Sequence, residues 1–548
     1  MRVSRNAAGA LALAIVLAAA QAYAQPTASA DTASAQPLQL TVDEAVRRAV
    51  EHNPDLAVVK LATEVAATRV GESRGAYTPV FSSALGRSSV DTPPSNLLLG
   101  DRGVTIGDWF SSTGVRQRVP WSGGSWSVSW DASRTTTNNP ISSFDPSVQS
   151  GFQVAFSQPL LRDRAVDAAR EQYAIAKRNA SISDLRFQEA VVQTVAGVKQ
   201  AYWTLKASLA NVTVQQRSLE LAEKLARDNR VRVDKGQLPP LDLVQAEAEV
   251  AARRESLIRA KTGAEDAADA LRRLIVDPAD RTLWEVPLEP VDEPPGPAGV
   301  PDVDRAVAAA LNERFDLLRA NTDLDNKKTA VEFFRNQQLP DVRLETSYGA
   351  TGLAGTQFLR TGTFPGSIVG TRDIGFANAL SQAFTNDYPT WSVGVTVSYP
   401  LGRGYERASL ARAEVERRQS EQQIASLRVQ AVEDVRRAGR QIRSAAERID
   451  AARAGETLAQ QRLDSEQRRY DVGLSTTFLV TQAQRDLLEA QVNVLRTSLD
   501  YESAVVNFEA VQHAPAAGDA VVIDGAAIVP VSTPAPHGLF RAAAGSGS

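Results

Sequence analysis

The sequence contains two copies of one long pattern, and this duplication constrains the fold more than any other feature. Each copy opens with a helical stretch, at Val42 in the first copy and at Val303 in the second. The same distance separates each opening from a proline, Pro79 or Pro340, after which apolar and polar residues alternate. A strand, a very long proline-free helix, a glycine-marked turn and a shorter helix then follow. Repeats of this kind build elongated structures from similar units, so we expect two copies of one unit rather than several globular domains.

Composition argues against most kinds of enzyme. The 548 residues include no cysteine, three histidines and one methionine, and the net charge is −4. The absence of cysteine excludes disulfides and thiolate metal sites, and so few histidines leave little material for another metal centre. A slightly acidic chain offers no basic surface for nucleic acid. We therefore expect no catalytic residue, no metal and no cofactor.

The N-terminus has the pattern of a secretory signal peptide. Arg2 and Arg5 precede an apolar stretch, and Ala22-Tyr23-Ala24 supplies the small residues of a cleavage site. The apolar stretch, with about 14 residues, is shorter than the roughly 20 that a bilayer-spanning helix needs. We expect residues 1–24 to be removed as a signal peptide, rather than kept as an anchor, and the protein to be exported.

Composition and proline positions divide the rest of the chain. We expect a flexible segment at 25–40, a first repeat at 41–276, a second repeat at 302–512 and a disordered tail at 513–548. Residues 277–301 hold seven prolines. Because that density interrupts any helix, these residues form the linker between the two repeats.

The absence of proline predicts two helices of unusual length. None occurs between Pro159 and Pro239 or between Pro400 and Pro515. A helix over 160–234 would span roughly 110 Å at 1.5 Å per residue, and it would need support along its whole length. Residues spaced seven apart in this helix form two rows, as in a coiled coil. The apolar row is Leu205, Val212, Leu219, Ala226 and Val233. The row three positions further on is small and polar: Ser208, Gln215, Ala222 and Asn229. We infer that each helix makes a narrow apolar contact bordered by solvated side chains. Each helix would then pack against a neighbouring helix on two sides, as in a hollow cylinder of helices.

A shorter helix is expected over 42–75, and strands of roughly 8–11 residues are expected where apolar and polar residues alternate with a period of two. The strand segments lie near 80–89, 150–158, 341–350 and 390–399, with a further hairpin near 114–134. Their apolar faces carry aromatic residues near the ends, and the opposite faces carry Ser, Thr, Gln and Gly. An antiparallel sheet on a soluble core is the common alternative, but aromatic ends and a small polar face favour a membrane barrel.

Four to six strands per chain are too few to close a barrel, since the smallest bacterial barrels have about eight. An open edge in lipid costs several kcal/mol for each unpaired backbone group. Several chains must therefore share one barrel. The role of the hairpin near 114–134 stays open at this point: it would widen the barrel, plug it, or form a periplasmic flap.

A series of short motifs resembles the outer-membrane efflux (TolC-type) proteins, over about residues 38–512. The motifs are Asp43-Glu44-Ala45-Val46, Asn53-Pro54-Asp55-Leu56, Tyr77-Thr78-Pro79, Phe156-Ser157-Gln158-Pro159-Leu160-Leu161-Arg162 and Tyr470-Asp471-Val472-Gly473-Leu474. The resemblance implies an α+β membrane protein, a homotrimer that shares one transmembrane β-barrel in outer-membrane lipid. A long antiparallel α-helical barrel would extend it into the periplasm.

The same resemblance implies a function and partners. The protein would be the passive exit duct of a tripartite efflux or type I secretion system. Its partners would be a periplasmic adaptor (membrane fusion) protein and an inner-membrane pump or ABC exporter. The chain lacks a nucleotide-binding motif such as GxxxxGK[ST], so the energy would come from that pump. A periplasmic adaptor and a structural coiled-coil envelope protein are the alternatives, but an adaptor predicts one helical hairpin rather than two duplicated ones.

The resemblance also indicates site residues. The two turns would contact the adaptor, and glycine suits the left-handed conformation that ends a helix; the turn residues are Lys235, Gly236, Gln237, Leu238, Asp471, Val472, Gly473, Leu474 and Ser475. Acidic residues just past these turns narrow the pore entrance in the family. Asp242 matches that pattern, although an Asp in the first turn of a helix is also favoured by the helix dipole. The second repeat has Gln482 there, with no carboxylate until Asp486.

Overall fold

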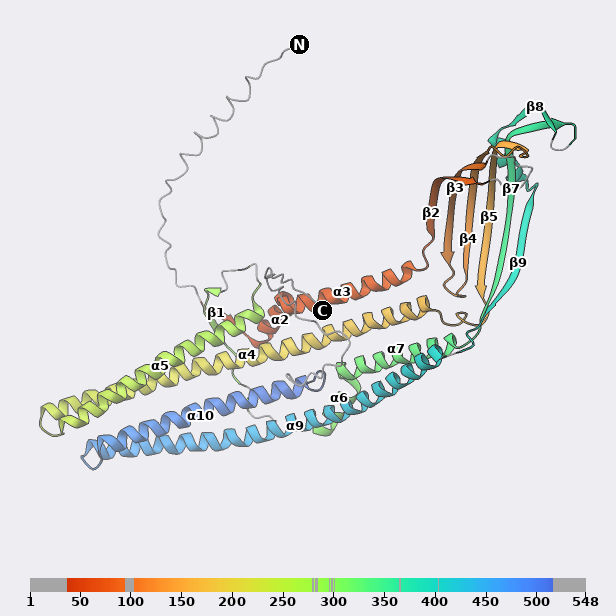
Figure 1. Ribbon diagram of the computed structural model, residues 1–548. Helices are drawn as coiled ribbons and strands as arrows, with labels where there is room; N and C mark the ends of the chain where they lie inside the picture. The colour runs from red at the N-terminus through yellow and green to blue at the C-terminus, as the bar shows by residue number, and fades with distance from the viewer. Residues whose placement is uncertain are drawn as a thin grey trace, which may run out of the picture.

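In the computed structural model the chain forms a long rod of helices that ends in a curved β-sheet (Figure 1). The described residues are 37–93, 103–277, 280, 284–294, 296, 299, 301–363, 366–402 and 404–515. The expected signal peptide, most of the segment 25–40 and most of the tail 513–548 lie outside them. None of the helices in the described part of the chain has an apolar stretch long enough to cross a membrane.

Two long helical hairpins, one from each repeat, form the rod. In the first, α4 (Ala168–Asp234) turns into α5 (Pro240–Ile275); in the second, α9 (Gly404–Asp471) turns into α10 (Thr477–Ala510). Shorter helices lie beside α4 and α9 (Figure 1). Along the halves nearest the sheet lie α3 (Pro54–Gly75) and α7 (Phe315–Gln337), and beside the middles lie α2 (Val42–His52) and α6 (Val303–Glu313).

Two helix boundaries differ from the expectation. The helix expected over 42–75 is broken at Asn53, which is extended (φ −66°, ψ 119°), because Asn53 caps α3 by accepting a hydrogen bond from the Leu56 amide at 3.1 Å and Pro54 follows it. The long helix expected from residue 160 begins only at Ala168. Asp163 has a left-handed φ of 65°, and the Asp167 side chain caps α4 by accepting from the Arg170 amide at 2.8 Å.

The segments expected to be flexible or disordered are partly ordered at their inner ends. Leu38–Leu40 form β1, which pairs in parallel with β6 (Leu288–Pro290) in the proline-rich linker. Leu40 is fully buried there, and the Tyr202 hydroxyl donates to its carbonyl at 2.9 Å. At the other end the His513 carbonyl accepts from the Phe315 amide at 2.9 Å. Burial and backbone pairing thus order both ends.

Beyond the rod, the strands among the described residues form one antiparallel sheet. Its order is β2-β3-β4-β5-β7, and β9 and β8 both pair with β7, β9 along its first half and β8 along its second. The strands are β2 (Val80–Thr92), β3 (Val104–Arg118), β4 (Ser125–Thr137), β5 (Phe144–Pro159), β7 (Asp341–Thr361), β8 (Ser367–Ile374) and β9 (Pro389–Ser398). The hairpin expected near 114–134 is β3–β4. It lies inside the sheet, hydrogen-bonded on both sides, so it is neither a plug nor a flap.

Strand β8 and the short helix α8 (Phe376–Thr385) were not expected from the sequence. Helix α8 packs against β7 and β5 through its small residues Ala379 and Ala383, which are buried. The approach is close: the Ala379 carbonyl oxygen lies 1.9 Å from the position a Cβ would take at Gly352. Glycine at this position is what allows the helix to lie on the sheet.

The register gives the sheet one apolar and one polar face, as the period of two predicts. On one face Val128 of β4 lies between Val115 of β3 and Val154 of β5. On the other, Ser129 lies between Gly114 and Gln153. The outermost strands β2 and β9 are exposed along almost their whole length. Both edges of the sheet are therefore open in the single chain.

A buried ion cluster joins the start of α7 to α9. Arg314 is fully buried at the break between α6 and α7, and its guanidinium donates to the carboxylates of Asp316 and Asp434, each at 3.0 Å. Both carboxylates are buried as well. A buried charge with its partner removed is costly, so this cluster holds the shorter helix pair of the second repeat against the long helix.

The substitution Arg314→Met should destabilise the fold by about 3–5 kcal/mol, because it leaves two buried carboxylates without their cation. Thermal unfolding of the purified protein in detergent measures this. Arg436→Met removes an exposed arginine from the same stretch of α9 and should change stability by less than about 0.5 kcal/mol. Equal effects of the two variants would show that the cluster has no special role.

Candidate functional site

The two turns that connect the long helices lie side by side at the end of the rod farthest from the sheet (Figure 1). They are the same structure formed twice. Gly236 has a φ of +70° and Gly473 a φ of +77°, as expected from the sequence. The residue after each glycine donates its amide to a carbonyl five residues back: Gln237 to Arg232 and Leu474 to Arg469, both at 2.8 Å. No atom lies within 4 Å of a Cβ built at either glycine, so backbone conformation, not space, requires glycine here.

A buried polar cluster ties the two turns together. Asn229 of α4 is fully buried, and its side-chain amide donates to the Thr477 hydroxyl at 3.2 Å. Its carbonyl oxygen accepts a hydrogen bond from the Tyr470 hydroxyl, which is also buried. Arg232 stacks over the Tyr470 ring at 4.4 Å and donates to the Tyr470 carbonyl at 3.1 Å. The first repeat thus supplies Asn229 and Arg232, and the second supplies Tyr470 and Thr477.

The role of Asn229 differs from the prediction: the heptad pattern placed this residue in the small and polar row, on a solvated side of the helix, whereas it is fully buried. In the structure the most buried line on this part of α4 runs through Ser218, Ala222, Leu225 and Asn229. The sequence feature that could have indicated this role is an Asn at a heptad-spaced position. A single buried Asn at such a position is a known way to set the register of packed helices.

A second link between the hairpins is an ion pair further up the rod. Arg485 of α10 donates to the buried carboxylate of Glu249 on α5, with the Nε–Oε2 distance at 3.2 Å. Arg253 contacts the same carboxylate. Burial alone would raise the pKa of Glu249, but the two guanidinium groups outweigh it, so the pKa lies below its usual value. Glu249 therefore stays charged at neutral pH, and the link persists.

The residues predicted at the entrance lie close to these links. Asp242 is half-buried in the first turn of α5, and its backbone carbonyl accepts from the Asn229 side chain at 3.3 Å. Gln482 donates to Asp486 at 2.7 Å, and Asp486 also pairs with Arg462 at 2.6 Å. Asp242 thus lies next to the buried cluster, whereas Gln482 belongs to a separate polar chain on the second hairpin.

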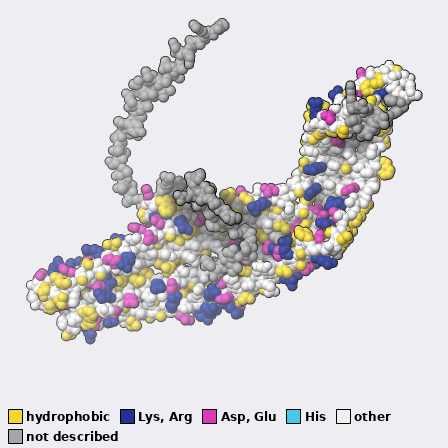
Figure 2. Space-filling model, viewed as in Figure 1, with side chains coloured by type: hydrophobic (Ala, Val, Ile, Leu, Met, Phe, Trp, Pro, Cys, Tyr) yellow, Lys and Arg dark blue, Asp and Glu magenta, His cyan; other side chains and the backbone are white. Residues whose placement is uncertain are grey.

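The turns expose apolar side chains that the chain itself does not cover. Hydrophobic groups are visible at this end of the rod in Figure 2. Val472 and Leu474 are 71% and 78% exposed, and Phe478 is 63% exposed. Among the predicted turn residues, Lys235, Gly236, Gln237 and Asp471 are exposed, Leu238 is half-buried, and Ser475 donates to Glu466 at 2.7 Å. This hydrogen bond is the largest of the effects that lower the pKa of Glu466.

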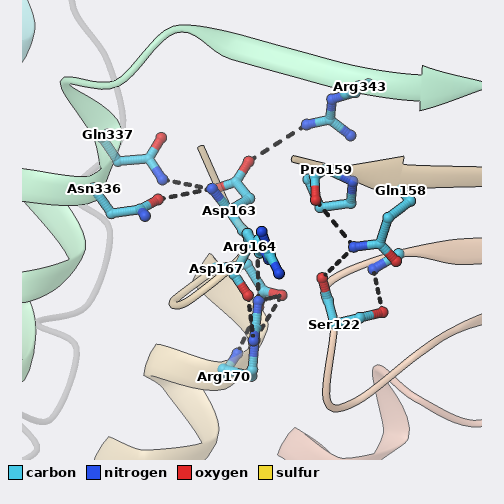
Figure 3. Close-up of polar contacts among 11 residues, drawn as sticks. Ser122, Gln158, Pro159, Asp163, Arg164, Asp167, Arg170, Asn336, Gln337 and Arg343 are labelled. Atoms are coloured by element: carbon cyan, nitrogen blue, oxygen red, sulfur yellow. Dashed lines mark hydrogen bonds and ion pairs between the residues drawn. The ribbon is translucent and has the colours of Figure 1, made fainter. Parts of the chain in front are cut away.

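A separate polar network fixes the junction between the rod and the sheet (Figure 3). The Asp163 amide donates to Asn336 and the Asp163 carboxylate accepts from Gln337, both at 2.7 Å. Arg170 donates to the Asp163 carbonyl at 2.6 Å. Because Asp163 follows β5 and Asn336 precedes β7, the network holds the strand-to-helix connection of the first repeat against the helix-to-strand connection of the second. In the described residues, no group of three or more His, Asp or Glu side chains could hold a metal ion.

Comparison with known proteins agrees with this architecture. The family model described as "Outer membrane efflux protein" matches residues 117–275 and 306–511. No curated protein matches the chain. Among solved structures, a membrane protein from Pseudomonas aeruginosa is 18% identical with a TM-score of 0.61, covering 86% of this chain and 92% of that one. The CmeC outer membrane channel of Campylobacter jejuni is 17% identical with a TM-score of 0.60, covering 86% and 85%. CusC is 14% identical with a TM-score of 0.63, covering 88% and 94%. At identities this low, the structural similarity establishes a shared fold and nothing more.

The substitution Asn229→Ala should loosen the two turns, because it leaves Tyr470 and Thr477 without their buried partner at a cost of about 1–3 kcal/mol. Hydrogen–deuterium exchange should become faster in peptides that cover both turns, including the one that was not mutated. Gln216→Ala, at an exposed position of the same helix, is the control and should leave exchange there unchanged. Faster exchange in the first turn alone would contradict a link between the repeats.

Proposed function

The chain belongs to the outer membrane efflux protein family, and from this premise we propose that three copies form one continuous duct from the periplasm through the outer membrane. The protein is an outer-membrane efflux channel and not an enzyme. The observation that supports the shared duct best is the open sheet, whose edge strands β2 and β9 are both exposed. In lipid those edges need partners, and two further copies supply them in a closed ring.

The helical rod carries the duct into the periplasm. Its four long helices have neighbours on both sides only if adjacent copies complete the ring, as the sequence pattern predicts. The chain has no nucleotide-binding motif, so an inner-membrane pump or ABC exporter supplies the energy, and the duct itself is passive.

The two turns are the surface that a periplasmic adaptor contacts. Support comes from their exposed apolar residues Val472, Leu474 and Phe478 at the far end of the rod. Apolar side chains rimmed by polar ones are typical of protein interfaces. Lys235, Gly236, Gln237 and Leu238 of the first turn and Asp471, Gly473 and Ser475 of the second complete this surface.

The channel itself is tested by isolation and reconstitution. The protein should fractionate with the outer membrane, run as a trimer that dissociates on heating, and give discrete conductance steps in planar bilayers. A soluble monomer without conductance would contradict the proposal and favour a structural coiled-coil protein or an adaptor.

Asp242 lines the closed entrance in this proposal, close to the buried cluster that joins the turns. Asp242→Ala should weaken the preference of the closed channel for cations by about 1 kcal/mol per site, roughly fivefold, because a ring of carboxylates favours cations. Reversal potentials in a salt gradient measure it. Asp234→Ala removes an exposed carboxylate before the same turn and should have little effect. Unchanged selectivity in the Asp242 variant would place this side chain outside the pore.

The adaptor surface is tested at Leu474, which is exposed at the second turn. Leu474→Asp should weaken binding to the cognate adaptor by at least tenfold, because the charge would have to lose its water at the interface. Leu474→Met keeps an apolar side chain at the same position and should bind normally. Binding can be measured between purified trimer and adaptor in detergent, and equal affinities of the two variants would move the contact elsewhere.

A further inference from the structure

Strands outnumber helices where the rod meets the sheet. Four helices connect directly to strands: α3 leads into β2, β5 leads into α4, α7 leads into β7, and β9 leads into α9. The helices pack in the order α3, α4, α7, α9, which is the order of their strands in the sheet. The hairpin β3–β4 lies between β2 and β5 with no helix below it (Figure 1). In the described part of the chain, four helix columns therefore meet six strand columns, with β8 extending the column of β9.

In a trimer, a ring of twelve helices and a barrel of eighteen strands would have nearly the same perimeter. Helices pack 8–10 Å apart, so a ring of twelve has a perimeter of about 110 Å. Strands about 4.8 Å apart and tilted by about 40° each occupy about 6 Å of a barrel's circumference, so eighteen give about 113 Å. Without the hairpin, twelve strands at the same tilt would give only about 75 Å. The added hairpin makes the sheet as wide as the helical ring that leads into it.

The hairpin is a full member of the barrel wall. Strand β3 pairs with β2 from Val80 to Thr92 without a register shift, and β4 pairs with β5 from Ser125 to Thr135. The apolar and polar faces continue across it, as Val128 and Ser129 show. The chain thus specifies a six-stranded segment rather than a four-stranded one with an appendage.

The edges fit one another. Strand β2 runs away from the helices and β9 runs back toward them, so β2 of one copy and β9 of the next meet antiparallel, like every other neighbouring pair in the sheet. Phe81 and Leu85 lie on the apolar face of β2, and Val395 and Val397 lie on that of β9. Odd-numbered residues of both strands therefore face the same side when they pair.

We propose that three copies close an eighteen-stranded barrel, and that the β3–β4 hairpin keeps the outer-membrane pore as wide as the helical duct. This rests on the trimeric channel proposed above. The barrel measures about 36 Å between opposite backbones, and its inner wall is lined by small side chains such as Gly114 and Ser129. Barrels of 16–18 strands leave an aqueous channel.

Single cysteines test the position of the hairpin, since the natural chain has none. In the full-length trimer, Ser129→Cys should react with a membrane-impermeant maleimide at least tenfold faster than Val128→Cys, which faces lipid. Val128→Cys should in turn be quenched, when labelled with a small fluorophore before reconstitution, by quenchers attached to lipid chains. Fast labelling at both positions in an intact trimer would overturn the eighteen-stranded wall and leave the channel function standing.

Cysteine pairs test the closure between copies. Ser83→Cys on the apolar side of β2 should form a disulfide-linked trimer with a cysteine at one of Val393, Val395 or Val397, and not with Thr396→Cys, whose side chain lies on the other face. No crosslink at any of the three, in a protein that still runs as a trimer, would exclude β2–β9 pairing. A protein that is no trimer at all would instead refute the proposed function.

Polymer exclusion tests the width. Poly(ethylene glycol) added on the extracellular side should enter the pore up to a hydrodynamic diameter of about 20 Å, given the backbone diameter and small wall residues. Deletion of 93–143 joins β2 directly to β5. The backbone diameter should then fall by about a third, to about 24 Å, so the polymer limit should fall by more than half. A wild-type limit near that of a twelve-stranded barrel would contradict the proposal, and the cysteine measurements decide it should the shortened chain fail to fold.

Discussion

The need to pair every backbone group at membrane depth governs this structure. A sheet with two open edges is unstable in lipid, and no rearrangement within one chain can close six strands into a barrel. In the proposed trimer the chain depends on its own copies, and the requirement extends to the rod, because strands arranged in a ring would place the helices joined to them in a ring as well. The duplication fits this demand: two similar units per chain supply the wall elements, and hydrogen bonds around Asp163 join the two units where the rod meets the sheet.

Much of this was predictable because two periods are written plainly in the sequence. The alternation in 390–399 places every second residue on one face, so the strand and its two environments follow directly. The long proline-free stretch and the heptad rows around Leu205 and Leu219 indicate a helix that needs lateral neighbours. Gly236 and Gly473 mark the turns for a local reason, their positive φ, that needs no tertiary information.

The remaining features depend on contacts that no local pattern encodes. Helix 42–75 has an apolar pattern throughout, yet Asn53 ends one helix and begins another. The hairpin β3–β4 was visible as strands, but its place in the sheet depends on pairing with β2 and β5. Helix α8 depends on a missing side chain at Gly352. From the sequence Asn229 is predicted to be a surface residue. It is buried because the fold places Tyr470, 241 positions away, against it. The contacts assigned to the adaptor and to Asp242 depend on other chains and stay proposals.

The choice of polar groups to join the two turns has a consequence for any separation of the two hairpins. Asn229, Tyr470 and Thr477 are held by hydrogen bonds, and water can replace each of those bonds when the hairpins separate. The exchange of one partner for another costs only about 0.5–1.5 kcal/mol per bond. Leucines at the same positions would lose their contacts to water with no replacement. The contact between the two turns is thus specific when formed, costs little free energy to break, and can reform in the same register.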